Sequence, residues 1–184
     1  MLALCAARIL TFVLFISISI SIWGNSSHAE STSLAIKTFG LVGTWSLDCS
    51  LTRGVVRTTW AVPMLFGGFS GFPTMTNEAT TKDGHTITQI SEIEEALRVT
   101  EDKIKLRTVI GKRAGPEPLG AWLPEEGERW EFVLFKLSGR YRVVSGGTAD
   151  GKKISAKDGF SYRQSNGQFE RTEKLTAFYE KCLN

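Results

Sequence analysis

The sequence predicts a mainly β protein: an antiparallel β-barrel or sandwich of about 8–10 strands with a short C-terminal helix. Apolar and polar residues alternate along several stretches, as they do on half-buried strands. Turn sequences such as Asp83-Gly84 and Asn166-Gly167 separate these stretches at short intervals. The last apolar residues follow the spacing of one helix face instead. These three observations together favour a small β domain that a helix completes.

The first 29 residues have the features of a secretory signal peptide. Arg8 precedes an apolar run over residues 9–22, and the small residues Ser27 and Ala29 occupy the −3 and −1 positions. A permanent membrane anchor is the alternative, but this run would span only about 21 Å as a helix, whereas the bilayer core is about 30 Å thick. We therefore expect cleavage after Ala29 and a single periplasmic domain over 30–184, with secretion or an uncleaved anchor as alternatives.

Predicted strands follow one another along this domain. The first covers 41–49, where apolar residues alternate with Thr44, Ser46 and Asp48. Further strands are predicted over 55–62, 85–99, 104–110, 129–137, 141–145, 159–163 and 168–171. The segment 129–137 is apolar on both faces, so we expect it near the centre of the sheet. An apolar Gly/Phe loop at 63–73 and a Pro/Gly-rich loop at 111–127 interrupt the series.

The C-terminal segment has a helical pattern. Leu175, Phe178, Tyr179 and Cys182 have the spacing i, i+3, i+4, i+7, and Thr172 is a suitable cap. We expect the helix to lay this face on the barrel and to present its cysteine to the first strand.

The cysteines predict one disulfide. Cleavage after Ala29 would remove Cys5 and leave Cys49 and Cys182, and two cysteines in an exported domain pair with each other. A reactive thiol is the alternative, but it needs a device that lowers its pKa, and His85 is the only histidine of the sequence after residue 29. The same composition predicts no metal site, and no motif predicts a cofactor.

The segment Gly43-Thr44-Trp45, on the first predicted strand, resembles the Gly-x-Trp signature of lipocalins and other calycins. These families include small periplasmic protease inhibitors. The resemblance covers these three residues, the chain size and the expected C-terminal helix, while the lipocalin motif Thr-Asp-Tyr is absent. It implies a barrel closed by Trp45, with Arg163 or Arg171 packed over the ring. The chain also resembles small exported proteins of Gram-negative bacteria.

The sequence favours binding over catalysis. A net charge of +3 without a concentrated basic face does not predict nucleic-acid binding. The segment 68–72 lacks the final glycine of a nucleophile elbow. Glutamate clusters within 92–95 and 125–128 are present, but a glycosidase needs two carboxyl groups placed across a cleft, and a solvated acidic edge is the alternative. A small secreted hydrolase is therefore only the third hypothesis.

The candidate binding residues are Phe66, Phe69, Phe72 and Trp122. The three phenylalanines lie among glycines in the uncharged segment 63–73, which either plugs one end of the barrel or forms a lip that contacts a ligand, a partner or a membrane. We predict an exported, non-enzymatic protein that binds an apolar small molecule or a protein partner, with a protease-inhibitor-like barrel as one version. An envelope-associated interaction protein without a ligand is the alternative.

Overall fold

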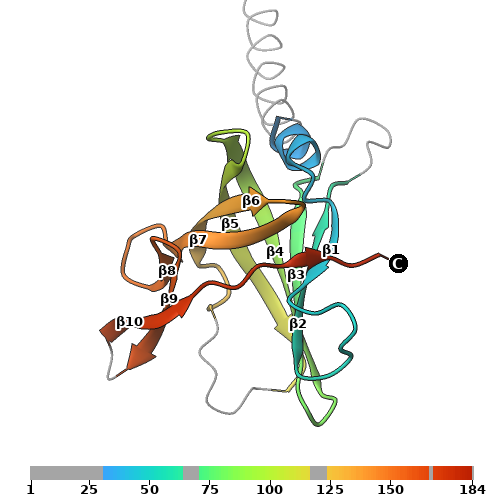
Figure 1. Ribbon diagram of the computed structural model, residues 1–184, viewed down its shortest axis with the longest axis vertical. Coiled ribbons are helices and arrows are strands. Elements are labelled where there is room, and N and C mark those ends of the chain that lie inside the picture. Colours follow the sequence, from blue (N-terminus) through green and yellow to red (C-terminus); the bar gives the residue numbers. More distant parts are fainter. Residues whose placement is uncertain (1–30, 64–70, 117–123, 166–167, 184) are drawn as a thin grey trace, which may run out of the picture.

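The computed structural model describes residues 31–63, 71–116, 124–165 and 168–183. Its described strands form one antiparallel sheet in the order β10-β9-β8-β7-β6-β5-β4-β3-β2-β1-β11. Their bounds are β1 Gly43–Ser46, β2 Val55–Ala61, β3 Thr74–Thr80, β4 Thr86–Arg98, β5 Lys103–Ala114, β6 Arg129–Leu137, β7 Arg140–Thr148, β8 Ile154–Lys157, β9 Phe160–Ser165, β10 Gln168–Leu175 and β11 Glu180–Lys181. The sheet curls so that its two halves face each other across an interior (Figure 1). The predicted mainly β, antiparallel fold is confirmed, but the sheet is a curled, barrel-like one, and these eleven strands exceed the expected 8–10.

The C-terminal segment connects the two sides of the curled sheet. β11 pairs with β1, where Trp45 lies opposite Lys181. Immediately before β11, Tyr179 exchanges two backbone hydrogen bonds with Tyr141 of β7, with N–O distances of 3.1 and 2.7 Å. Residues 179–181 therefore bridge β7 and β1, and β1 to β7 surround one barrel-like interior. β8, β9 and β10 extend the sheet beyond the other end of β7.

The predicted C-terminal helix is wrong, because its residues are extended. Leu175 ends β10 and is exposed, whereas Tyr179 points into the interior and Phe178 contacts the guanidinium groups of Arg140 and Arg142. A helix of about eight residues is marginal by itself. An extended segment instead gains backbone partners on both β7 and β1, so tertiary pairing overrides the local spacing.

A helix does occur at the other end of the domain, over residues 31–39. It lies against one end of the barrel-like sheet, where Ile36 and Phe39 are buried in the core (Figure 1). Gly40 ends the helix with a φ of +83°, a left-handed conformation that favours glycine. Lys136 of β6 donates a hydrogen bond to the Phe39 carbonyl oxygen at 2.8 Å. This helix therefore covers one end of the interior.

The disulfide between Cys49 and Cys182 is confirmed. It joins the loop after β1 to the residue after β11, with a Cα–Cα distance of 5.4 Å across a sequence separation of 133 residues. The backbone N–H of Cys182 also donates to the Thr44 carbonyl oxygen at 2.9 Å. A covalent bond and a backbone bond thus fix the C-terminal segment to the first strand.

The two loops singled out in the sequence begin at different ends of the domain. β2 ends and β3 begins on the side of the helix, whereas β5 ends on the opposite side (Figure 1). The Pro/Gly-rich loop also begins later than predicted, because β5 continues to Ala114. Gly111 lies within this strand, where a Cβ atom would be only 2.2 Å from the carbonyl oxygen of Ile90. That glycine serves close strand packing and does not mark a turn.

Candidate functional site

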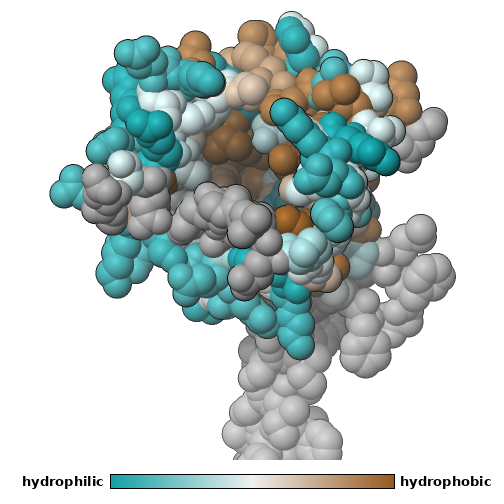
Figure 2. All heavy atoms as spheres, turned by 90° about the horizontal axis from the view of Figure 1, so that it is seen from below, coloured by the Kyte–Doolittle hydropathy of each residue, from teal (hydrophilic) through white to brown (hydrophobic). Residues whose placement is uncertain are grey.

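A cavity of about 120 Å³ lies in the interior of the barrel-like sheet. Its walls come from β2, β3, β6, β7 and the C-terminal segment, through Thr58, Trp60, Met75, Asn77, Phe132, Leu134, Tyr141, Val143 and Tyr179. Seen from the end opposite the helix, the molecule has a hollow with hydrophobic side chains inside it (Figure 2). The cavity therefore lies in a barrel interior that the helix covers at one end.

Strand alternation places these side chains in the interior. Thr58 and Trp60 are two residues apart on β2, and in the register of the sheet they lie opposite Asn77 and Met75 of β3. Successive side chains of a strand point to opposite faces, so each such pair faces the same way. Phe132 and Leu134 repeat the spacing on β6. The cavity is thus a product of the same period-two pattern that the sequence shows.

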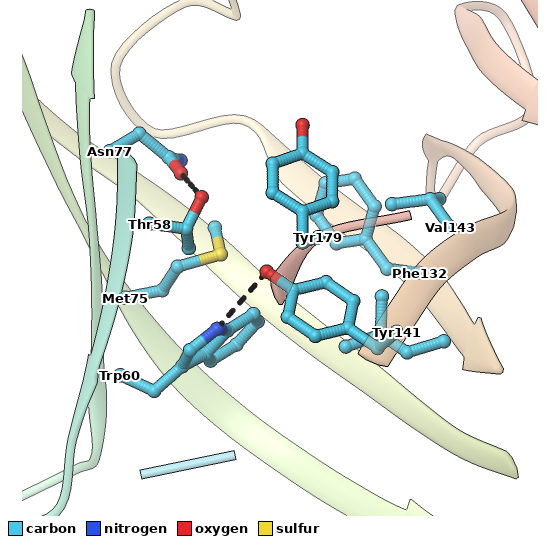
Figure 3. A pocket seen from close by; sticks show the side chains of 9 residues that line it. Thr58, Trp60, Met75, Asn77, Phe132, Tyr141, Val143 and Tyr179 are labelled. Carbon is cyan, nitrogen blue, oxygen red and sulfur yellow. Dashed lines mark hydrogen bonds between the residues drawn. The ribbon is translucent and has the colours of Figure 1, made fainter. Parts of the chain in front are cut away.

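Tyr141 is the centre of an aromatic cluster that forms one wall of the cavity. Its ring lies 5.0 Å from the Trp45 ring in an edge-on arrangement and 5.2 Å from the Tyr179 ring in a stacked one. The Trp60 indole N–H donates to the Tyr141 hydroxyl at 3.3 Å (Figure 3). Such ring pairs contribute about 0.5–1.5 kcal/mol each beyond the area they bury. The cluster holds Tyr179, and with it the C-terminal segment, against the barrel.

The polar atoms of the cavity are few and uncharged. Thr58 Oγ1 donates a hydrogen bond to Asn77 Oδ1 at 2.8 Å (Figure 3). The amide nitrogen of Asn77 and the hydroxyl of Tyr179 have no hydrogen-bond partner among the described residues. No acidic or basic side chain occurs among the residues that line the described cavity. The site therefore offers apolar contact and neutral hydrogen-bonding groups.

Burial raises the pKa of both cavity tyrosines. Loss of hydration disfavours the phenolate, and it lifts the pKa of Tyr141 well above its ordinary value, partly offset by the hydrogen bond from Trp60. The pKa of Tyr179 is raised by burial as well. Both hydroxyl groups therefore stay protonated in the folded protein at a pH at which an exposed tyrosine ionises.

We expect the free energy of unfolding to fall as the pH rises above about 10, the ordinary pKa of tyrosine. Above that pH, the unfolded chain releases protons that the folded chain keeps, so the unfolded state binds fewer protons and stability decreases by up to about 1.4 kcal/mol per pH unit per tyrosine. Urea unfolding between about pH 9 and 11 measures the slope. The Tyr141→Phe variant should show a shallower slope, and identical slopes for the two proteins would contradict the assignment.

The candidate residues from the sequence do not line the described cavity. Phe72 is 42% exposed on the connection between β2 and β3. Phe66, Phe69 and Trp122 lie outside the described residues. The cavity residues Met75 and Asn77 were missed because β3 has a polar sequence without an apolar alternation. The sequence feature that indicated this strand was the hairpin turn at Asp83-Gly84, because a hairpin turn requires a strand on each side.

Trp45, the residue that carries the resemblance to calycins, is a core residue. It is 2% exposed, and its indole N–H donates to the Leu41 carbonyl oxygen at 2.6 Å. The resemblance places Arg163 or Arg171 over this ring. In the structure the cation near the Trp45 ring is Lys181, at 5.8 Å, while Arg171 lies 3.6 Å from the Phe160 ring. Trp45 thus has a structural position next to the cavity wall.

The glutamate clusters form ion pairs on the outer surface. Glu95 and Glu131 both contact Arg107, at 3.1 and 3.0 Å, in a ladder across β4, β5 and β6. Glu125 and Glu128 both contact Lys153. The pairs of Arg107 are largely exposed and contribute about 0–1 kcal/mol each, whereas Lys153 and Glu128 are partly buried. The described carboxylates of the two clusters therefore lie apart from the cavity.

The remaining observations concern metal ions, membranes and similarity to known proteins. Among residues 31–63, 71–116, 124–165 and 168–183, no group of three or more His, Cys, Asp or Glu is placed to hold a metal ion. In the same ranges, no helix has the length and apolar character needed to cross a membrane. No protein-family model, no curated protein and no solved structure matches the chain.

Proposed function

We propose that the protein is an exported, non-enzymatic binding protein that accepts a small apolar molecule, or the apolar end of a larger one, in the cavity between β2, β3, β6 and β7. The observation that carries this proposal is the cavity of about 120 Å³ within an otherwise buried aromatic interior. The cavity opens to solvent on one side and is lined mainly by apolar side chains, which is the form that small-molecule pockets take at the mouths of β-barrels.

The size of the cavity limits what enters it. An engineered cavity of about 150 Å³ accepts benzene, whereas pockets for drug-sized ligands begin at about 300 Å³. The volume of about 120 Å³ therefore suits one ring or a short branched chain. A larger ligand would place only one end inside.

Two features support export. The first 29 residues have the features of a signal peptide, and the Cys49–Cys182 disulfide fits an oxidising compartment. The periplasm is the location in our proposal. Native mass spectrometry of the protein from its own host tests both parts, since it measures the N-terminus and any retained small molecule.

Filling the cavity should abolish binding. Val143 lines the cavity, whereas Val99 is 54% exposed, so Val143→Phe and Val99→Phe are the same change inside and outside the site. We expect the inner variant to weaken binding of a small aromatic probe such as ethylbenzene at least tenfold, and the outer variant to leave it unchanged. Met75→Phe serves as a second cavity variant if the first does not fold.

Binding is measured by titration of the full 184-residue protein, followed through the indole N–H signal of Trp60 in NMR spectra. Equal affinity in the inner and outer variants would contradict the cavity as the site. A protein that retains no small molecule and binds no probe would instead favour the envelope-associated interaction protein, the alternative without a ligand.

A further inference from the structure

Two hydrogen-bond donors that line the cavity have no acceptor among the described residues. The Tyr141 hydroxyl accepts a hydrogen bond from Trp60 Nε1 at 3.3 Å. Thr58 lines the same cavity. Thr58 in turn donates to Asn77 Oδ1. This bond uses one of the two lone pairs of the Asn77 amide oxygen, and the amide nitrogen, which carries two hydrogens, has no acceptor among the described residues.

The second free donor comes from the opposite wall. The Tyr179 hydroxyl lies at the far end of a ring that stacks on Tyr141, and Figure 3 shows it pointing away from that ring. Asn77 belongs to β3, and its amide nitrogen points into the space between the two walls (Figure 3). Two donors from different elements thus border one largely apolar space. Neither is among the fully buried polar atoms that lack a partner, so solvent reaches both, and a ligand that displaces this water must supply an acceptor or lose about 1–3 kcal/mol per donor.

The surroundings exclude an anionic acceptor. The side chains that line the described cavity carry no positive charge, and an unpaired carboxylate placed there would lose its hydration without compensation. The raised pKa of the two tyrosines has the same cause, because this environment disfavours negative charge. A carbonyl oxygen fits, since it is neutral and has two lone pairs for two donors.

We infer that the preferred ligand is a neutral carbonyl compound, a ketone, ester or amide that carries one small apolar ring or branched group. Its carbonyl oxygen accepts hydrogen bonds from Asn77 and Tyr179. Its apolar group lies against Trp60 and Met75, which form the inner wall of the cavity. This inference rests on the proposed function and adds the chemistry that the ligand must bring.

Three probes of nearly equal shape separate the possibilities: acetophenone has a carbonyl, ethylbenzene has no polar atom, and benzoate has a charge. With the full 184-residue protein at neutral pH, we expect acetophenone to bind about tenfold more tightly than ethylbenzene, the effect of one or two net hydrogen bonds. Benzoate should not bind. The Trp60 indole N–H signal reports each titration.

Conservative variants test the two donors. Tyr179→Phe and Asn77→Leu should each weaken acetophenone binding several-fold and leave ethylbenzene binding within about twofold. Tyr162→Phe is the matched control, because Tyr162 lies in β9 and does not line the cavity, and it should change neither affinity.

The outcomes separate this inference from the proposed function. If ethylbenzene or benzoate binds as tightly as acetophenone, the carbonyl inference is overturned while a binding cavity remains. If the two donor variants leave the preference for acetophenone intact, the assignment of the donors is overturned. If none of the three probes binds, the proposed function fails together with the inference.

Discussion

Replacing both Cys49 and Cys182 with serine is expected to lower the free energy of unfolding by about 2–5 kcal/mol. The disulfide closes a loop across 133 residues, so its loss gives the unfolded chain far more conformational freedom. Without the disulfide, the C-terminal segment keeps its short pairing with β1, the Cys182–Thr44 backbone bond and the contacts of Tyr179 with Tyr141. The C-terminal segment should therefore detach more readily from the barrel-like sheet.

Urea unfolding of the wild type and the double variant measures this effect. A reductant should destabilise the wild type by a similar amount and leave the double variant unchanged, which separates loss of the disulfide from the effect of the serine side chains. Binding of acetophenone should weaken as well, because Tyr179 leaves the cavity wall when the segment detaches. A change in unfolding free energy below about 1 kcal/mol would show that the pairing and ring contacts suffice without the disulfide.

Tyr141→Ala should be the most damaging single substitution in the cavity wall, with a loss of about 3–5 kcal/mol. Tyr141 is 2% exposed and contacts the rings of Trp45, Trp60 and Tyr179. Its removal leaves a large void and leaves the Trp60 indole N–H without its acceptor. The backbone bridge to Tyr179 would lose the ring stacking that accompanies it.

Tyr141→Phe is the control, because it keeps the ring and removes only the hydroxyl. We expect it to cost about 1 kcal/mol, the net value of one hydrogen bond. Thermal or urea unfolding of the two variants gives the comparison. Equal destabilisation by Ala and Phe would contradict the role of the ring and assign the effect to the hydroxyl alone.

The sequence predicted those strands whose apolar residues alternate without interruption. β6 has the predicted bounds. Its apolar residues alternate along the whole strand: Trp130 and Leu134 fill the interior, while Val133 and Phe135 face the other side. β3 was not recognised, because its sequence is polar and it acquires an inner face only through pairing with β2 and β4. The alternation of apolar and polar residues therefore identifies a strand only when the strand's own sequence contains apolar residues at every second position.

The C-terminal segment shows why long-range pairing limits such predictions. The spacing of Phe178, Tyr179 and Cys182 fits a helix face, yet each residue has a different distant partner in the extended structure: two arginines, a tyrosine and a cysteine. The disulfide was predictable because the sequence after residue 29 contains only two cysteines. The cavity was not, since its walls meet only after the sheet has curled.

The bridge between Tyr179 and Tyr141 also has a consequence for the order of folding. The wall of the cavity combines residues near position 58 with a residue near position 179, and the segment that joins them is covalently fixed only when residue 182 is available. Contacts so distant in sequence form late, because a long loop must close first. When the chain is synthesised from its N-terminus, the sheet therefore stays open, and its apolar interior stays exposed, until β11 pairs with β1. During that interval, the apolar interior is exposed to chaperones and to other unfolded chains.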